Sequence, residues 1–251
     1  MYKIVSVHSF RGGTGKSNTT ANIAAVLALR GQRVGVVDTD IQSPGIHVLF
    51  GFDADSMEHS LNDYLWGKCT IEQTAHDLTS RLESDLDGAI FLIPSSIKPG
   101  DIAQVVRQGY DVGLLNDGFH DLVEKLNLDV LLIDTHPGLN DETLLSIAVS
   151  DSLAIIMRPD QQDFQGTGVT VEVARKLDVP RMGLVVNKVP SVFSMDDVKA
   201  RVEQIYNVPV LAVFPHSDEM MTLASEGIFI LRYPDHPLSD TFRNLAASLI
   251  D

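Results

Sequence analysis

The chain has 251 residues, of which 44% are hydrophobic, and its 34 acidic and 19 basic residues give a formal net charge of −15 at pH 7. This apolar content is typical of a globular protein and excludes a disordered chain. A single cysteine excludes a disulfide within the chain and an iron–sulfur cluster ligated by the cysteines of one subunit. No apolar run approaches the roughly 18 residues of a membrane span, and the N-terminal run is too short for a signal peptide, so we expect a cytoplasmic protein.

Short runs rich in valine, isoleucine and leucine alternate with helix-like segments, and the runs are apolar at nearly every position, as in strands covered on both faces. Strands are predicted at Ile4–Val7, Val34–Val37, Ala89–Ile93, Val130–Ile133, Leu153–Met157, Gly183–Val186 and Val210–Phe214. Helices are predicted at Thr19–Ala28, Leu61–Leu65, Asp117–Leu126, Thr143–Ala148, Gly168–Leu177, Asp196–Tyr206 and near the end of the chain. This order predicts a single α/β domain, residues 1–251, with a doubly wound, mostly parallel sheet and helices on both faces. Ligands of such sheets bind beyond the carboxyl ends of the strands.

A glycine-rich loop, Arg11–Ser17 with the sequence RGGTGKS, follows the first predicted strand and precedes the first helix. The P-loop pattern G-x-x-x-x-G-K-[ST] requires a glycine where Phe10 stands, so the pattern is met only in part. The glycines still allow backbone N–H groups to converge on phosphate oxygens, and the helix adds the positive end of its dipole. Lys16 is expected to reach the β- and γ-phosphates, and Ser17 to bind Mg²⁺. The alternative is a glycine turn that binds no ligand.

Acidic side chains follow two further predicted strands. Asp38 and Asp40 come directly after the second strand, where both carboxylates would face the site of the glycine loop. Asp134 ends the apolar run Val130–Ile133, which is the Walker B arrangement, and it is expected to hold Mg²⁺ through water. An aspartate pair that caps a helix is the alternative for Asp38 and Asp40. His136 is interpreted as a solvent-facing residue, with a role as a base as the alternative.

The glycine loop resembles the deviant Walker A loop, K-G-G-x-G-K-[ST], of the MinD/ParA family of P-loop ATPases. The resemblance extends through nearly the whole chain and includes the segments Val36–Asp40, Leu132–Gly138, Val185–Lys188, Val213–Met220 and Ala224–Gly227. The spacing of these segments is closer to MinD than to the longer ParA proteins. One position departs from the family pattern, because Arg11 stands where the family has its signature lysine.

The resemblance implies a homodimer that sandwiches ATP and Mg²⁺ between its subunits. The implied nucleotide-binding residues are Gly12, Gly13, Thr14, Gly15, Lys16, Ser17, Asn187, which would hydrogen-bond adenine, and Pro215, which would line the base pocket. The implied metal ligands are Ser17, Asp38 and Asp134, and the implied catalytic residues are Lys16, Asp40, which would polarise the attacking water, and Arg11. The signature lysine reaches the partner subunit's ATP, and we expect Arg11 to do the same, with a place on the solvated rim of the loop as the alternative.

Two classes of function fit this resemblance. The favoured one is a slow, partner-stimulated ATPase in which nucleotide binding drives dimerisation and so positions or regulates a cellular partner. The alternative is a metabolic ATP-dependent synthase of the same fold, of the cobyrinate a,c-diamide synthase or dethiobiotin synthetase type. The iron–sulfur reductase ATPases are disfavoured because Cys69 is the single cysteine.

The expected partner is another protein. The acidic net charge disfavours anionic lipid and also non-specific DNA, which stays a less favoured alternative. MinD proteins end in a basic amphipathic helix, whereas the last predicted helix has Arg243 beside Asp240, so we expect that helix to pack on the sheet and to anchor no membrane. Arg158 or Asp160 would lie near the dimer face, with an ordinary loop as the alternative.

Overall fold

The computed structural model of the protein describes residues 2–82 and 85–250, and the ends of the predicted domain, residues 1 and 251, lie outside these ranges. Its strands are β1 (Lys3–His8), β2 (Arg33–Asp38), β3 (His76–Asp77), β4 (Ala89–Ile93), β5 (Val130–Asp134), β6 (Ser152–Met157), β7 (Arg181–Val189) and β8 (Val210–Pro215). They form one sheet in the order β3-β4-β2-β5-β1-β6-β7-β8, and only the pairing of β3 with β4 is antiparallel. The carboxyl ends of the parallel strands therefore meet at one edge of the sheet.

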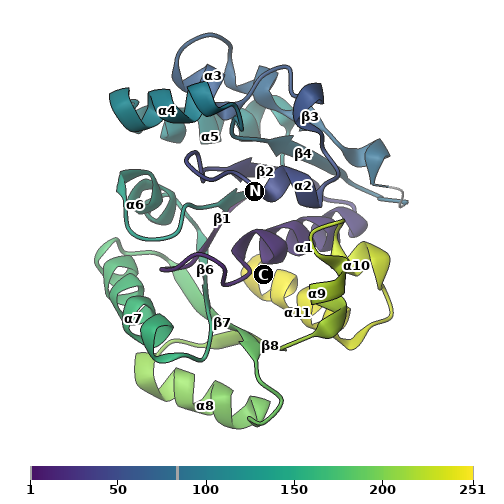
Figure 1. The fold of residues 1–251 in the computed structure, drawn as a ribbon, viewed down its shortest axis with the longest axis vertical. Helices are drawn as coiled ribbons and strands as arrows, with labels where there is room; N and C mark the ends of the chain where they lie inside the picture. Colours follow the sequence, from purple (N-terminus) through teal and green to yellow (C-terminus); the bar gives the residue numbers. More distant parts are fainter. Residues whose placement is uncertain (1, 83–84, 251) are drawn as a thin grey trace.

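Helices cover both faces of this sheet (Figure 1). One face packs against α1 (Lys16–Leu29), α2 (Ile46–Leu49), α9 (Asp218–Leu223), α10 (Phe229–Arg232) and α11 (Pro237–Ile250). The other face packs against α3 (Leu61–Leu65), α4 (Pro99–Gln108), α5 (Gly113–Leu126), α6 (Asp141–Ala148), α7 (Gln161–Lys176) and α8 (Met195–Tyr206). Short 3-10 turns lie at Ala54–Ser56, Ile71–Thr74 and Thr79–Arg81. The predicted doubly wound α/β fold is thus confirmed.

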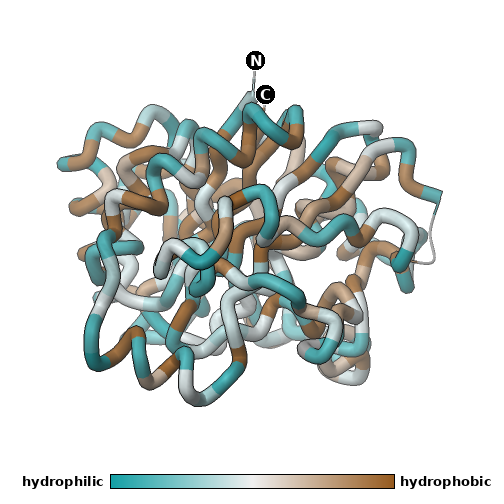
Figure 2. The backbone as a smooth tube through the Cα atoms, turned by 90° about the horizontal axis from the view of Figure 1, so that it is seen from above, coloured by the Kyte–Doolittle hydropathy of each residue, from teal (hydrophilic) through white to brown (hydrophobic). Residues whose placement is uncertain are grey.

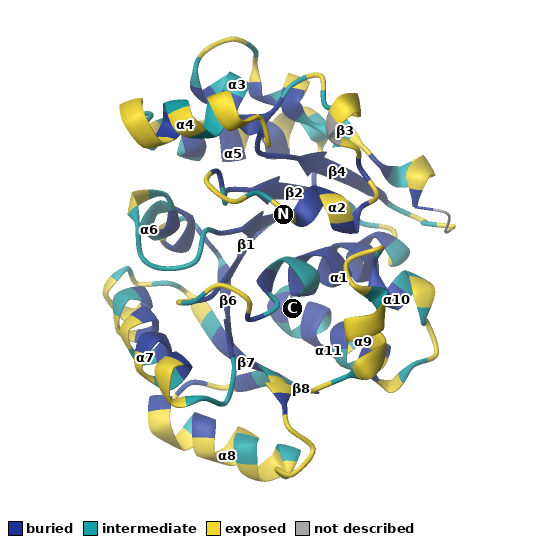
Figure 3. Ribbon diagram, in the orientation of Figure 1, coloured by how far each residue is buried: buried dark blue, intermediate teal, exposed yellow. Residues whose placement is uncertain are grey.

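The strands are apolar at successive positions because helices cover both faces of the sheet. In β5, Val130 and Leu132 pack in the cluster beneath α1, whereas Leu131 and Ile133 pack in the cluster beneath α5. Successive strand side chains point to opposite faces, so a strand covered on both sides needs an apolar residue at each position. Figure 2 shows hydrophobic segments through the middle of the molecule, and Figure 3 shows the central strands buried while the outer side of α8 is exposed.

Every predicted strand and helix is present, and most are longer by a few residues than the sequence indicated. The sequence did not predict β3, α2, α4, α9 and α10. The helices α2 and α10 have four residues each, which is too short for a periodic pattern. The helix α4 begins with Pro99, an accepted first residue of a helix, and among its residues only Val105 is buried. Its apolar residues Ile102, Val105 and Val106 do lie at helical spacing, so the pattern is present in the sequence and the prediction missed it.

The last helix packs on the protein as expected. The side chains of Leu238, Phe242, Leu245 and Leu249 on α11 are all buried, and Phe242 lies against Phe214 of β8 with ring centroids 4.6 Å apart. The apolar face of α11 is therefore already used for packing against α1 and the sheet. Among the helices in residues 2–82 and 85–250, none is both long and apolar enough to cross a bilayer.

Candidate functional site

The glycine loop leaves β1 and enters α1 at the carboxyl edge of the sheet. Gly13 and Gly15 have φ angles of 76° and 101°, a region that favours glycine. A Cβ atom on Gly15 would also collide with Nδ2 of Asn187, so a larger residue there would displace that amide. No described side chain caps the first turn of α1, which begins at Lys16. The free N–H groups and the helix dipole make this end of α1 suited to bind an anion.

The ammonium of Lys16 is buried beside the carboxylate of Asp134. The side chain of Lys16 is 8% exposed, and its Nζ lies 3.5 Å from Oδ1 of Asp134, which is 1% exposed. Thr20, one turn further along α1, donates its hydroxyl to the same oxygen at 3.1 Å. An ion pair thus connects the glycine loop with the end of β5, the two places where a Walker A lysine and a Walker B aspartate are expected.

A second carboxylate, that of Asp38 at the end of β2, is buried in the same region. It accepts hydrogen bonds from the backbone N–H groups of Asp40 at 3.0 Å and Gly45 at 3.2 Å. Burial, and then the negative charge of Asp134, raise the pKa of Asp38 to about 8. Two buried carboxylates therefore face one ammonium, and further positive charge would stabilise their ionised forms.

The donor set fits Mg²⁺ that arrives with a phosphate ligand. Within residues 2–82 and 85–250, no group of three or more His, Cys, Asp or Glu side chains could hold a metal ion alone. Asp38, Asp134 and the hydroxyl of Ser17 are oxygen donors, and proteins usually bind Mg²⁺ through one or two carboxylates together with substrate phosphates and water. Burial, and then the negative charge of Asp134, raise the pKa of Asp38, and the positive charge of such an ion would oppose both effects.

Asp40 faces the cavity of the glycine loop and pairs with His136. The cavity is about 390 Å³ in volume and is lined by residues that include Gly13, Lys16, Ser17 and Asp40. Nδ1 of His136 lies 2.6 Å from Oδ1 of Asp40, and this hydrogen bond raises the pKa of His136. The interpretation of His136 as a solvent-facing residue is wrong, because its side chain is only 22% exposed and is held by Asp40.

Arg11 is bound to its own chain. Its guanidinium lies 3.4 Å from Asp163 and 3.7 Å from Asp160, both at the start of α7. The same two carboxylates pair with Arg158, at 3.4 Å and 3.0 Å. Beside Arg11, Phe10 packs on α7 where Gly166 leaves room for its ring. Arg11 therefore contacts α7 of its own chain. Arg158 and Asp160, which were predicted to lie near a dimer face, are members of the same group of ion pairs.

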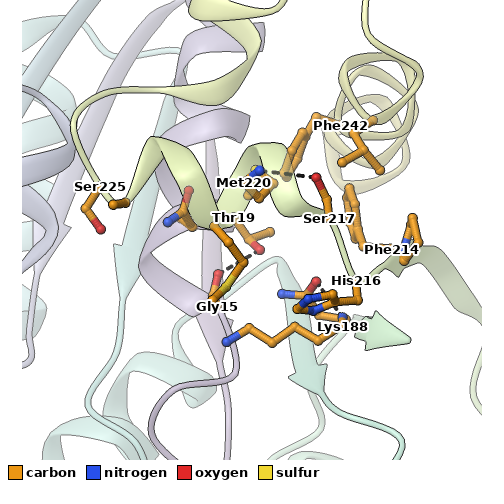
Figure 4. Close-up of a pocket in the computed structure, with 15 residues that line it drawn as sticks. Gly15, Thr19, Lys188, Phe214, His216, Ser217, Met220, Ser225 and Phe242 are labelled. Atoms are coloured by element: carbon orange, nitrogen blue, oxygen red, sulfur yellow. Dashed lines mark hydrogen bonds between the residues drawn. The ribbon is translucent and has the colours of Figure 1, made fainter. Parts of the chain in front are cut away.

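A second, more apolar cavity adjoins that of the glycine loop. Its volume is about 330 Å³, and it shares Gly15, Asn18 and Ser225 with the first. Figure 4 shows its wall, where Phe214, Met220 and Phe242 lie opposite Gly15 and Lys188. Asn187 and Pro215, the residues expected at a base pocket, both line this cavity. The two cavities adjoin at these shared residues and are together called the trough; its part at the glycine loop is polar, and its part beyond Gly15 is more apolar.

His8, at the end of β1, is the group beneath the glycine loop that the sequence did not single out. Its side chain is fully buried, and its Nδ1 lies 2.7 Å from the hydroxyl of Thr135. Burial, assisted by the charge of Lys16, lowers the pKa of His8 to about 3. His8 is therefore neutral at neutral pH, and it adds no positive charge to the site.

The structure brings the predicted residues of several strand ends into one trough. Lys16, Ser17 and Asp40 line the polar part, and Asn187 and Pro215 line the apolar part. Asp38 and Asp134 do not line the cavity themselves but are buried near it, with Asp134 paired to Lys16. Arg11 is directed elsewhere, towards α7. Sequence reasoning missed Asp163, Thr20 and Lys188, whose roles depend on long-range contacts that no local pattern reveals.

Comparison with known proteins agrees with this arrangement. Residues 2–179 match the family model described as an AAA domain. An uncharacterized ATP-binding protein of Methanocaldococcus jannaschii is 28% identical over 98% of this chain and 87% of its own length. An iron–sulfur cluster carrier protein of Pseudomonas fragi is 29% identical over 98% of this chain and 84% of its own length.

Solved structures share the fold. The cell division ATPase MinD of Pyrococcus furiosus superposes with a TM-score of 0.81 at 22% identity, covering 98% of both chains. MinD of Pyrococcus horikoshii, complexed with Mg-ADP, gives 0.80 at 21% identity, covering 99% of this chain and 96% of its own. Cobyrinic acid a,c-diamide synthase of Mycobacterium smegmatis, with bound ADP and magnesium, gives 0.75 at 21% identity, covering 99% and 94%. The chain belongs to the AAA domain family, and it has the fold of the MinD/ParA P-loop ATPases.

The buried, neutral His8 predicts a specific loss of stability in acid. The unfolded chain binds a proton at His8 as the pH falls below the ordinary histidine pKa of 6.5, whereas burial lowers the pKa of His8 in the folded chain to about 3. The contribution of His8 to the free energy of unfolding is therefore fully present above about pH 6.5. It falls at lower pH, by up to about 1.4 kcal/mol per pH unit for this one proton. Urea unfolding between pH 7.5 and 4.5 measures this slope. In His8→Asn, whose amide replaces Nδ1 beside Thr135, the slope should be smaller by that amount; an equal slope in both proteins would contradict the assignment.

Proposed function

We propose that this protein is an ATP-binding and ATP-hydrolysing dimerisation switch that positions or regulates a cellular partner in the cytoplasm, and that residues 1–251 act as a single ATPase domain. The observation that carries the proposal is the trough at the carboxyl edge of the sheet. Its polar part combines free backbone N–H groups with the buried ammonium of Lys16, and its apolar part has room for a base. A nucleoside triphosphate has this same division into polar and apolar parts.

ATP and Mg²⁺ are the ligands that this trough fits. The phosphates would lie against the N–H groups of the glycine loop, with Lys16 neutralising their charge. Ser17, Asp38 and Asp134 would hold Mg²⁺, which supplies charge neutralisation at the phosphate oxygens. The Mg-ADP complex of the MinD of Pyrococcus horikoshii, with the same fold, supports this choice. Adenine would occupy the apolar part beside Asn187 and Pro215.

Hydrolysis would depend on Asp40. Its carboxylate lines the polar cavity, and its contact with Nδ1 of His136 fixes the direction of that carboxylate. A carboxylate in this position can accept a hydrogen bond from a water molecule and so direct it towards the terminal phosphate. His136, held by the same contact, would serve as a positioning residue for Asp40.

Dimerisation would use Arg11. A guanidinium can bind two phosphate oxygens at once, but Arg11 is paired here with Asp163 and Asp160 of its own chain. To reach the nucleotide of a partner subunit, Arg11 must leave these carboxylates, and the phosphates of bound ATP would compete for it. The dimer would therefore form with ATP and separate after hydrolysis, when the terminal phosphate is lost.

The partner is expected to be a protein. The net charge of −15 opposes contact with anionic lipid and with DNA, and DNA stays the less favoured alternative. The apolar face of α11 is buried against the rest of the protein. An iron–sulfur carrier role like that of the relative from Pseudomonas fragi is not supported, because two copies of the chain would offer two cysteines where a cluster usually needs four. The metabolic synthase remains the alternative, since the synthase from Mycobacterium smegmatis shares the fold. Stimulation of ATP turnover by a macromolecule rather than by a small acid would separate the two.

Lys16→Ala tests nucleotide binding. The substitution removes the charge that offsets the phosphates, so the affinity for Mg·ATP should fall at least about a hundredfold, since charge-assisted hydrogen bonds contribute a few kcal/mol. Titration calorimetry measures the affinity. Lys125→Ala, which removes an exposed lysine that pairs with Glu72 and Asp121, is the control and should bind like the wild type. Undiminished affinity in Lys16→Ala would exclude a P-loop role for the trough.

Asp40→Ala tests hydrolysis. This variant should bind Mg·ATP normally but hydrolyse it about a hundredfold more slowly, because it keeps the phosphate-binding loop and loses the group that directs water. Steady-state release of phosphate measures the rate. Asp53→Ala removes an exposed carboxylate of a neighbouring loop and serves as the control. If Asp40→Ala turns over ATP at the wild-type rate, the role of Asp40 is structural and not catalytic.

Arg11→Ala tests the role across the dimer. In the Asp40→Ala background, where ATP persists, Arg11→Ala should bind ATP through Lys16 but dimerise weakly, and Arg11→Lys should restore part of the dimer. Light scattering with ATP and with ADP measures the mass. Arg107→Ala, which removes an exposed arginine of α4, should dimerise normally. A full ATP-dependent dimer of Arg11→Ala would show that Arg11 has no role across the interface.

A further inference from the structure

Two successive residues at the end of β7 hold two successive carbonyl groups of the glycine loop. Nδ2 of Asn187 donates to the carbonyl of Thr14 at 2.8 Å, and Nζ of Lys188 donates to the carbonyl of Gly13 at 2.8 Å. Figure 4 shows the side chain of Lys188 extended beside His216 towards the loop that carries Gly15. The glycine loop is therefore fastened to a strand that lies more than 170 residues later in the sequence.

Because peptides are planar, these two contacts also fix the direction of the N–H groups of Thr14 and Gly15. A trans peptide is planar, and its C=O and N–H bonds point in opposite directions. The carbonyl of Gly13 belongs to the same peptide as the N–H of Thr14, and the carbonyl of Thr14 to the same peptide as the N–H of Gly15. No cis peptide occurs in the described residues. Fixing the two carbonyls towards β7 therefore directs both N–H groups to the opposite side, as an anion-binding loop requires.

The end of β7 is shaped so that Lys188 can make this contact. Lys188 has φ of 57°, a left-handed conformation that residues other than glycine seldom adopt. The pairing of β7 with β8 shifts register between Val186 and Val189, on either side of this residue. Oδ1 of Asn187 accepts the backbone N–H of Lys188 at 2.8 Å, which stabilises the turn. Unusual backbone conformations of this kind concentrate at functional sites.

We propose that Lys188 is a positioning residue for nucleotide binding, which orients the N–H groups of the glycine loop through the carbonyl of Gly13. The proposal rests on the proposed function in one respect, because the anion is taken to be the phosphate of a nucleotide. The stem of Lys188 also lines the apolar cavity, beside Asn187 and His216. Lys188 thus connects the part of the trough suited to a base with the part suited to phosphates.

An alternative explanation is that the charge of Lys188 attracts phosphates without orienting the loop. The two explanations differ in the protein without nucleotide. If Lys188 fastens the loop, removing its ammonium loosens the loop even when no phosphate is present, whereas a distant charge has no such effect. Hydrogen–deuterium exchange of the amides in residues 9–18 of the nucleotide-free protein therefore distinguishes them.

The test compares Lys188→Met, which keeps an unbranched apolar stem and loses the ammonium, with Lys188→Arg, which keeps a charged donor. Lys199→Met removes an exposed lysine of α8 and is the matched control for net charge. We expect Lys188→Met to bind Mg·ADP about tenfold more weakly by calorimetry, the effect of one hydrogen bond to a charged group near the surface. Lys188→Arg should recover most of the affinity, and Lys199→Met should match the wild type.

Two further measurements complete the test. Amide exchange in residues 9–18 without nucleotide should be faster in Lys188→Met than in Lys199→Met. The KM for ATP should rise about tenfold with kcat unchanged at saturation, because the loop binds the ground state and the transition state alike. Wild-type affinity together with wild-type exchange in Lys188→Met would overturn the proposal, and so would weaker binding with unchanged exchange. If the wild type itself fails to bind Mg·ADP, the proposed function fails, while the exchange comparison still decides whether Lys188 fastens the loop.

Discussion

The buried ammonium of Lys16 is the group on which the rest of the site depends. It lies 3.5 Å from Asp134, and its positive charge opposes the rise in the pKa of Asp38. Two carboxylates that have left water need more positive charge than one ammonium supplies, and the raised pKa of Asp38 is the result. The buried carboxylates of the site therefore carry more negative charge than the protein itself neutralises, and a divalent cation bound together with phosphates would balance it.

The fold supplies this site with rigid supports. The end of β1 leads into the glycine loop, β2 and β5 provide the two buried carboxylates, and β7 holds the outer carbonyls of the loop. All these strands are parallel and end at the same edge, so their ends converge without any long loop. The guanidinium of Arg11, which is 37% exposed, is instead paired with the exposed carboxylate of Asp160 and the buried carboxylate of Asp163 at the start of α7. That difference suits Arg11 to be the part that moves while the others stay fixed.

The sequence was sufficient to predict the parallel strands of the sheet, the glycine loop and the residues at the strand ends, because apolar runs and the RGGTGKS pattern are local features. The resemblance to the MinD/ParA family added Asn187 and Pro215, which do line the same cavity. The sequence was not sufficient to predict the pairing of Arg11 with Asp163, which lies 152 positions away. Nor did it reveal the burial of His8 or the left-handed backbone of Lys188, because a histidine after a strand and an Asn-Lys pair look ordinary until the tertiary contacts are known.

A crystal structure of the protein with Mg·ADP would test the central claim most directly. Phosphate oxygens are expected within hydrogen-bond distance of the N–H groups from Gly13 to Ser17, with the ammonium of Lys16 beside the β-phosphate. Mg²⁺ is expected beside Ser17, and adenine in the apolar cavity next to Asn187 and Pro215. A nucleotide bound outside this trough, or a glycine loop that makes no contact with phosphate, would contradict the account.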